Sequence, residues 1–414
     1  MKKRILTLPL IAITGFAYAQ TDDAMSLGNR CLSLSYEEAV LGSARYSAMA
    51  GARLAIGEDI SVIRENPAGL GLFTKKSEVS VTPDFRMSNG NNNIGLANAG
   101  GVFVLGNNHK AEGYVSSALG ISYHRIKSFD NTQSSKGGDF SEDGNNGMYS
   151  AAYGFNIGNR RFFGLGINFI RGNYEQSTVN QYGTNSFDTK CTAWNIKAGA
   201  VIKLKEDINI ALALQSPTRY NFEETGVVNT YDKSDKIDGN KNYNDMEYHQ
   251  WGPLKAEAGF GWYIGSKSVL DIEYSYQDFS ALNVGNSYDY YNDVKDYLED
   301  YMKSVHTIRA GFETTPAQHF KARLGAAFTT SPAETPSKAY LQGKDIHYSV
   351  LIPHEAFYIG AGAGYEYRFL FADLAYQFKS QKADFLPSVC GGDYKTDSQT
   401  LKTSELLLTI GARF

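Results

Sequence analysis

Two arginines in the second half of the chain have the chemistry to bind an anionic head group. Arg309 and Arg323 each lie in a segment where apolar and polar residues alternate, and each falls on the polar side of that alternation. A guanidinium group binds a carboxylate through two parallel hydrogen bonds, so both residues are candidate ligand-binding residues. The alternative is a structural network with Glu313, Glu366 and Asp373.

Residues that would carry catalysis or bind metal form no recognisable motif. The seven histidines lie mostly in expected loops or turns, and the nucleophile motif G-x-S-x-G does not occur. Cys31, Cys191 and Cys390 match no zinc or haem spacing, although Cys191 and Cys390 are candidates for a disulfide. The net charge of −4, without a basic stripe, argues against a nucleic-acid partner. We therefore expect no enzyme activity, no cofactor and no metal site.

The first nineteen residues are typical of a cleaved signal peptide. Lys-Lys-Arg at positions 2–4 precedes an apolar stretch at 5–16, and Ala-Tyr-Ala at 17–19 forms the cleavage site. A membrane anchor is the alternative, but the apolar stretch is short and contains Pro9 and Gly15. No later apolar run reaches roughly 18 residues, the length that a membrane-spanning helix needs. The sequence therefore predicts export.

After residue 76 the chain alternates apolar and polar residues with the period of a β-strand. Tyr149, Tyr153 and Phe155 fall on one side of such a segment, and Ser150 and Gly154 fall on the other. The 28 Tyr, 23 Phe and 41 Gly, with only 10 Pro, also favour β-structure. We predict fourteen strands, near 77–87, 98–106, 116–127, 148–158, 161–173, 190–204, 207–218, 249–264, 268–280, 304–315, 320–330, 356–367, 370–380 and 403–414.

An even strand number and the order of connections favour a membrane barrel over a soluble sandwich. Tight turns alternate with long polar loops at 128–147, 174–189, 222–247, 281–303, 331–355 and 381–402. Ionisable residues in mid-strand all oppose the apolar set: Lys197, Glu257, Asp271, Glu273, Arg309, Arg323, Glu366 and Asp373. A lipid-facing Arg or Lys at mid-depth costs ~2–4 kcal/mol. A wall whose outer face meets lipid therefore requires its charged residues on the inner side of each strand, as found here. The predicted fold is an all-β, 14-stranded antiparallel transmembrane β-barrel over residues 77–414.

Residues 20–76 precede the first strand and contain a specific series of short motifs. They resemble the N-terminal hatch of the FadL/TodX family of outer-membrane transporters for hydrophobic compounds. The matching residues are Ala48 to Ala52, Glu58, Asp59, Ser61, Asn66, Pro67, Ala68, Gly69 and Leu70. Further along, Ser-Pro-Thr at 216–218, the segments at 271–274 and 308–313, and Phe414 are similar to family elements in the same order.

The resemblance implies passive uptake of hydrophobic compounds, such as long-chain fatty acids, by a monomer in the outer membrane. Ligand would be captured outside, enter a lumen plugged by the hatch, and leave through the barrel wall after the hatch rearranges. The turn Asn66, Pro67, Ala68 and Gly69 would gate passage, its alternative role being a tight turn that ends the hatch. By the same resemblance the third strand carries a kink, at Gly113 or Gly120.

The loop at 281–303 contains a candidate surface for external capture. Val294, Leu298, Tyr301 and Met302 recur at helical spacing and form an apolar face, with acidic residues opposite. The alternative is a helix that packs on other loops. Two other functions stay open at this point. A general porin would lack a hatch of this length, and haem uptake would need a histidine pair that the sequence does not offer convincingly.

Overall fold

The computed structural model describes residues 20–37, 40–73, 77–88, 91–107, 113–135, 138–180, 183–231, 237–285, 290–337, 341, 349–386 and 396–414. The predicted signal peptide (1–19), the end of the predicted hatch (74–76) and Cys390 lie outside these residues. Their assignments stay predictions.

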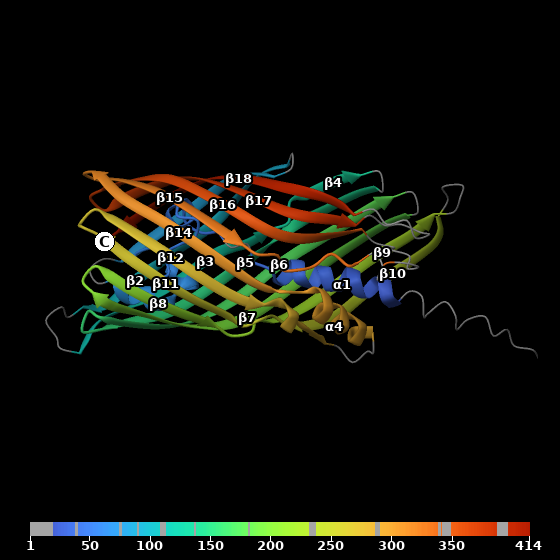
Figure 1. The fold of residues 1–414 in the computed structure, drawn as a ribbon, viewed down its shortest axis with the longest axis horizontal. Helices are drawn as coiled ribbons and strands as arrows, with labels where there is room; N and C mark the ends of the chain where they lie inside the picture. Colours follow the sequence, from blue (N-terminus) through green and yellow to red (C-terminus); the bar gives the residue numbers. More distant parts are fainter. Residues whose placement is uncertain are drawn as a thin grey trace, which may run out of the picture.

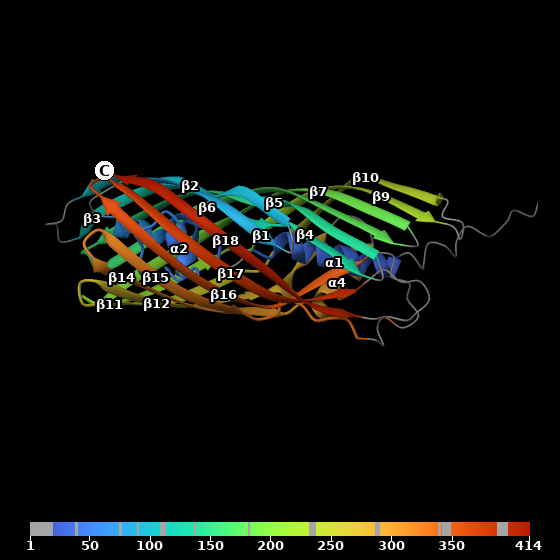
Figure 2. The same ribbon diagram turned by 90° about the horizontal axis from the view of Figure 1, so that it is seen from above.

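The described strands form a single antiparallel sheet that closes on itself, because β1 pairs with both β2 and β18 (Figures 1 and 2). Its strands are β1 (Glu78–Ser88), β2 (Asn91–Asn107), β3 (Tyr114–Ser128), β4 (Asn131–Ser135), β5 (Gly138–Ile157), β6 (Arg161–Asn180), β7 (Gly183–Lys205), β8 (Ile208–Gln215), β9 (Arg219–Tyr231), β10 (Ile237–Trp251), β11 (Lys255–Ile264), β12 (Ser268–Asp278), β13 (Asn283–Gly285), β14 (Ser304–Ala317), β15 (Phe320–Thr329), β16 (Val350–Tyr367), β17 (Leu370–Leu386) and β18 (Asp397–Arg413).

Short interruptions split four barrel strands into two labelled pieces. β3 and β4 both pair with β5, and β8 and β9 both pair with β7. In the same way β11 continues β10, and β13 continues β12 beyond the short helix η2 (Phe279–Ala281). The barrel therefore has fourteen strands, as the sequence predicted.

One end of the barrel extends much further than the sequence predicted. The segments expected to be loops at 128–147, 174–189 and 222–247 are largely strand, and so is much of 381–402. β6 and β7, for example, stay paired up to Asn180 and Gly183. The prediction was wrong here because the outward face of these extensions is largely polar, as at Asp188, Lys190 and Glu223. The apolar alternation used to find strands is therefore absent, although the ladder of backbone hydrogen bonds continues.

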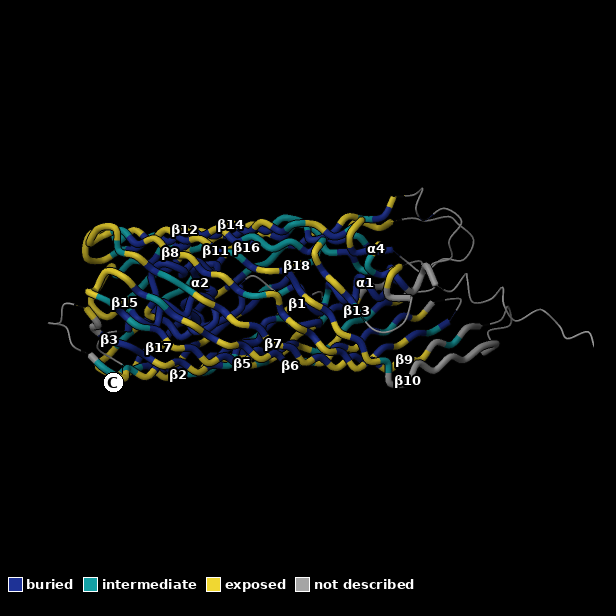
Figure 3. Tube along the Cα trace, turned by 90° about the horizontal axis from the view of Figure 1, so that it is seen from below, coloured by how far each residue is buried: buried dark blue, intermediate teal, exposed yellow. Residues whose placement is uncertain are grey.

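The two faces of the wall differ as predicted from the side of each strand on which the charged residues fall. Apolar side chains point outward, as for Leu165 at 63% exposure and Ile308 at 55%, whereas Asn168, Lys197 and Arg309 are buried in the interior. Figure 3 shows exposed and buried residues alternating along the wall around a buried interior. A wide outer belt of exposed apolar side chains is stable against hydrocarbon and costly in water.

The N-terminal segment lies inside the ring of strands (Figure 2). Helix α1 (Gln20–Ser35) occupies the half of the lumen nearest to α4 (Tyr290–Tyr301), and we call this end of the barrel the long-loop end. Helices α2 (Ala44–Ala48), α3 (Val62–Glu65) and η1 (Pro67–Leu72) occupy the other half, the short-turn end. None of the described helices is long and apolar enough to cross a membrane.

Candidate functional site

The turn at Asn66 sits directly against the barrel wall, in a position where the wall has no side chains. A Cβ atom on Gly164 would lie 2.2 Å from the backbone carbon of Pro67, and one on Gly199 would overlap Asn66. The Asn66 side chain donates to the carbonyl of Leu54 (3.0 Å) and accepts from the amide of Ala68 (3.2 Å). The predicted gating turn, including Gly69, is therefore buried in the lumen, and its backbone contacts wall backbone on β6.

Glycines on the opposite wall receive the other side of the hatch. A Cβ on Gly325 would lie 2.1 Å from the backbone of Met49, and one on Gly360 would lie 2.2 Å from the carbonyl of Ser47. The segment between Ser47 and Ala50 therefore packs as closely on β15 and β16 as the Asn66 turn does on β6. Both contacts join hatch backbone to wall backbone. The hatch is therefore packed between two surfaces of the wall, which leave little room for a residue larger than glycine at these positions.

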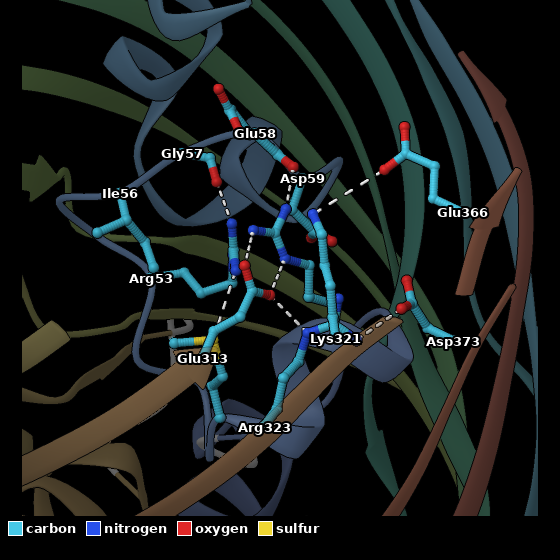
Figure 4. A network of polar contacts seen from close by, with 12 residues as sticks. Arg53, Ile56, Gly57, Glu58, Asp59, Glu313, Lys321, Arg323, Glu366 and Asp373 are labelled. Carbon is cyan, nitrogen blue, oxygen red and sulfur yellow. Dashed lines mark hydrogen bonds and ion pairs between the residues drawn. The ribbon is translucent and has the colours of Figure 1, made fainter. Parts of the chain in front are cut away.

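An ion-pair network links the hatch to the wall (Figure 4). The carboxylate of Glu313 on β14 accepts from Arg45 of α2 (2.6 Å) and from Arg323 on β15 (2.5 Å). Arg323 also donates to Asp373 on β17 (2.5 Å). Arg45 additionally donates to the carbonyl of Glu58 in the hatch (2.6 Å). One wall carboxylate thus binds a hatch guanidinium and a wall guanidinium together.

Two further wall carboxylates cap backbone amides of the hatch. Glu273 accepts from the amides of Arg53 and Leu54, and Asp271 accepts from the amide of Ala55 (3.1 Å). Glu273 also binds Arg309 (3.2 Å). These contacts tie the chain between α2 and α3 to β12 and satisfy donors that the hatch could not otherwise satisfy in a buried position.

The predicted arginines are therefore both interior and both already bound to carboxylates. Arg309 pairs with Glu273, and Arg323 pairs with Glu313 and Asp373. Arg323 thus has two of the three partners offered in the alternative, whereas the partner of Arg309, Glu273, was not among them, and Glu366 binds Arg413 (3.0 Å). Their role in ligand binding stays a prediction.

Inside the hatch, Asp59 organises the loop before α3. It accepts hydrogen bonds from the Ser43 hydroxyl (2.8 Å) and the Ser61 amide (2.9 Å). Burial opposes ionisation of this carboxyl, but Arg53 and Arg45 and the Ser61 hydrogen bonds hold its pKa below the usual value. Asp59 is therefore an anion that neutralises the buried arginines of the hatch.

The long-loop half of the lumen is lined by apolar and aromatic residues, and α1 fills it. Leu27, Cys31 and Leu32 of α1 share one buried cluster with wall residues that include Met148 and Ile170. A cavity of about 90 Å³ remains between the end of α1 and β1, β3 and β16–β18, which is small beside ligand pockets of roughly 300–1,000 Å³. A larger hollow at the rim, of about 1150 Å³, is lined mainly by polar side chains. The apolar space is therefore occupied by α1.

The predicted capture residues contact this helix. Val294, Leu298 and Met302 are buried in the cluster around α1, and Tyr301 is partly buried against it. Asn29 of α1 donates to the Tyr297 hydroxyl (2.8 Å). The packing alternative thus describes α4 in this structure, and external capture by these four residues stays a prediction.

Sequence reasoning missed α1 and the residue that anchors it, Glu224 on β9. Arg30 of α1 donates to both oxygens of the Glu224 carboxylate, at 2.9 and 3.3 Å. The apolar spacing of Ala24, Leu27 and Cys31, three and four residues apart, was the available signal for a helix. Glu224 gave no such signal, because it lies in a segment that was expected to be a loop.

The described cysteines, Cys31 and Cys191, are buried and are not joined to each other. Burial is the largest effect and raises the pKa of the Cys31 thiol. The nearby Arg30 lowers this pKa and Glu224 raises it, each to a smaller extent. The disulfide alternative for Cys191 involves Cys390, so it stays a prediction. Among the residues with described positions, no group of three or more His, Cys, Asp or Glu is placed to hold a metal ion.

The predicted kink at Gly120 lies in a continuous part of the wall. Gly120 pairs with Val102 on β2 and Ala152 on β5, and its Cα faces Ile63 of the hatch. Gly113 precedes β3 with φ of 111°. The described pairing of β2 with β3 ends at Asn98, whereas β2 stays paired with β1 up to Asn91. The ladder between β2 and β3 is thus shorter than the strands that form it.

Three solved structures share this architecture at low sequence identity. A Pseudomonas aeruginosa FadL homologue matches with TM-score 0.64 and 13% identity over 90% of this chain and 98% of its own. The monoaromatic hydrocarbon channel CymD gives 0.64 and 10% over 92% and 99%. The Pseudomonas putida toluene transporter TodX gives 0.63 and 10% over 91% and 99%. No protein-family model and no curated protein sequence matches the chain.

At identities this low, the likeness concerns the course of the backbone. It extends over nine-tenths of this chain and nearly the whole of each of the three proteins. The chain therefore has the FadL/TodX-type fold, a barrel of fourteen antiparallel strands closed around an N-terminal hatch.

Proposed function

We propose that this protein carries hydrophobic small molecules across the outer membrane, passively and without covalent chemistry. The observation that carries the proposal is the pairing of two apolar surfaces. The exterior is a belt of exposed apolar side chains suited to lipid, and the long-loop half of the lumen is a second apolar surface that ends at α2, α3 and η1 of the hatch. A water-filled pore for polar solutes would not need an apolar interior. The predicted signal peptide agrees with an outer-membrane location.

The names of the similar structures support the same class of ligand. One is a toluene transporter, another a monoaromatic hydrocarbon channel, and a third a FadL homologue. Whether long-chain fatty acids are cargo depends on where a carboxylate would bind. Arg309 and Arg323 both bind wall carboxylates already, so a fatty acid would have to compete with them.

The proposed route has the hatch rearrange and the ligand leave through the wall. The hatch contacts the wall through close-packed glycines, buried hydrogen-bonded charges and several small apolar clusters, such as the one that joins Ile63 and Leu70 to Val102. The short ladder between β2 and β3 supports an exit between these strands, because fewer backbone hydrogen bonds hold them together. Passage would then require breaking the Glu313 and Glu273 contacts of the hatch.

Uptake by cells whose outer membrane carries lipopolysaccharide tests the proposal. Initial accumulation of radiolabelled toluene and of a radiolabelled small sugar would be compared with and without the protein. We expect faster accumulation of toluene and no change for the sugar. Faster sugar accumulation would instead show a general porin, and no change for any apolar solute would refute the proposal. A Gly199→Trp variant serves as the control with a displaced hatch, because its large side chain would occupy the position of Asn66.

A further inference from the structure

The Glu224 carboxylate is a buried anion held in place by the barrel wall itself. Its side chain is fully shielded from solvent, and Oε2 accepts hydrogen bonds from Thr189 on β7 (3.0 Å) and Tyr248 on β10 (3.2 Å). These partners all belong to the barrel, so the anion site does not depend on the hatch for its geometry. It lies within the apolar half of the lumen, where an uncompensated charge is costly.

The cation that pairs with Glu224 comes from α1. The Arg30 guanidinium binds both Glu224 oxygens and lies 4.2 Å from the ring centroid of Phe187 on β7. Phe222, beside Glu224 on the same wall, packs against Tyr248 at 4.9 Å between ring centroids. A carboxylate surrounded by aromatic rings is a surface that recognises organic cations. We call Glu224, Thr189, Tyr248 and Phe187 the Glu224 cage.

We propose that the Glu224 cage is a binding site for the head group of a hydrophobic organic cation, such as an alkylammonium or alkylguanidinium compound. Arg30 occupies the cage in this structure, and such a ligand takes its place when it displaces α1. The inference rests on the proposed function and narrows its ligand class to apolar molecules that carry a positive charge.

The charge of the ligand determines the free-energy cost of displacing α1. Withdrawing α1 removes Arg30, so the ion pair with Glu224 is lost, at a cost, inside an apolar part of the lumen. A neutral hydrocarbon leaves that cost uncompensated, and a fatty acid adds a second carboxylate beside the first. A ligand with an ammonium or guanidinium group restores the ion pair. α1 contributes no strand to the barrel, so its departure leaves the pairings of the sheet intact.

The ligand tail has a place in the volume that α1 vacates. Leu27 and Cys31 belong to the same buried cluster as Met148, Ile170 and Phe222 of the wall, so removal of the helix exposes apolar wall. The cavity that now adjoins α1, of about 90 Å³, is too small for an alkyl chain of detergent length. Ligand binding and the docked position of α1 are therefore mutually exclusive.

Binding of three dodecyl probes to the mature full chain in lipid nanodiscs tests the inference. Dodecylammonium, dodecanol and dodecanoate would be titrated by calorimetry at pH 7, with empty nanodiscs as the blank. We expect dodecylammonium to bind about tenfold or more tightly than dodecanol. Glu224→Gln should abolish that preference. Arg30→Met should strengthen dodecylammonium binding, because the competing cation is gone. Glu142→Gln, a carboxylate on β5 bound by Tyr174, is the matched control and should keep the preference.

Cys31 provides a second readout that does not depend on the Glu224 variant folding. In a Cys191→Ser, Cys390→Ser background, dodecylammonium should speed labelling of Cys31 by a water-soluble maleimide severalfold, since the thiol is buried while α1 is docked. Equal affinity for the three probes, an unchanged preference in Glu224→Gln, or a protected Cys31 with dodecylammonium bound would each overturn the inference. In those cases toluene uptake would still support the proposed function. Failure of every probe to bind, together with failure of toluene uptake, would overturn both.

Discussion

Single residues decide how closely the hatch meets the wall, and Gly164 is the clearest case. A Cβ at this position would overlap the backbone of Pro67, which has no flexible end to move away. We expect Gly164→Ala to lower the free energy of unfolding by about 1–3 kcal/mol, as overpacking does. Urea unfolding in detergent, followed by tryptophan fluorescence, measures this. Gly166→Ala is the control, because its Cβ would meet atoms no closer than 3.2 Å; equal losses in both variants would contradict the interpretation.

Glu313 shows how a buried charge stabilises the contact between the hatch and the wall. Its carboxylate binds Arg45 of the hatch and Arg323 of the wall, so Glu313→Gln leaves two buried guanidinium groups with weaker partners. Removing one member of a buried ion pair typically costs about 3–5 kcal/mol, and we expect a loss of that size in the same unfolding assay. Glu334→Gln removes an exposed partner of Lys303 and should change little. Comparable losses in the two variants would show that the Glu313 network does not hold the hatch.

At the scale of elements, the contact between α1 and α4 joins the hatch to the long connection between β13 and β14. Leu298 and Met302 are buried there, and a Cβ on Gly28 of α1 would lie 2.6 Å from the Tyr297 ring. We expect the double change Leu298→Asp, Met302→Asp to undock α4 and speed maleimide labelling of Cys31 at least severalfold while the barrel stays folded. Glu299→Gln, on the exposed face of α4, should leave the labelling rate unchanged. An unchanged rate in the double variant would show that α1 is held without α4.

The elements also show where sequence patterns stop being informative. Alternation such as Tyr149, Ser150 and Tyr153 predicted the strands because one face meets lipid and the other does not. Beyond that belt the outward face carries polar side chains such as Glu175 on β6, so the apolar alternation disappears and strands were taken for loops. Which carboxylate binds Arg323 depends on the stagger between neighbouring strands, and a single sequence does not specify it. The helical period of α1 was present, but nothing in it pointed to Glu224.

For the whole molecule, the lumen is closed in two successive layers, and the two can be removed separately. Deleting residues 20–35 removes α1 and leaves the rest of the hatch packed between the wall glycines, whereas deleting 20–73 removes all of the hatch that the structure describes. We expect the first deletion to add little ion conductance in planar bilayers and the second to open a water-filled pore with a large, steady conductance. Both variants should keep the barrel, since neither deletion touches a strand. A large conductance after the shorter deletion would mean that the hatch alone does not seal the lumen.

The path of the chain places Gln20 and Phe414 at opposite ends of the barrel, so labels at these two positions give different information. Gln20 begins α1 at the long-loop end, whereas Phe414 lies at the short-turn end, where its amide donates to the Ser77 carbonyl (3.0 Å) (Figure 1). In a membrane, the two positions face opposite compartments. If the long-loop end faces the cell exterior, we expect antibodies on intact cells to reach an epitope inserted before Gln20, and to reach it to a different extent when α1 withdraws. We expect an epitope beyond Phe414 to be reached only from the inner side and to show no such change.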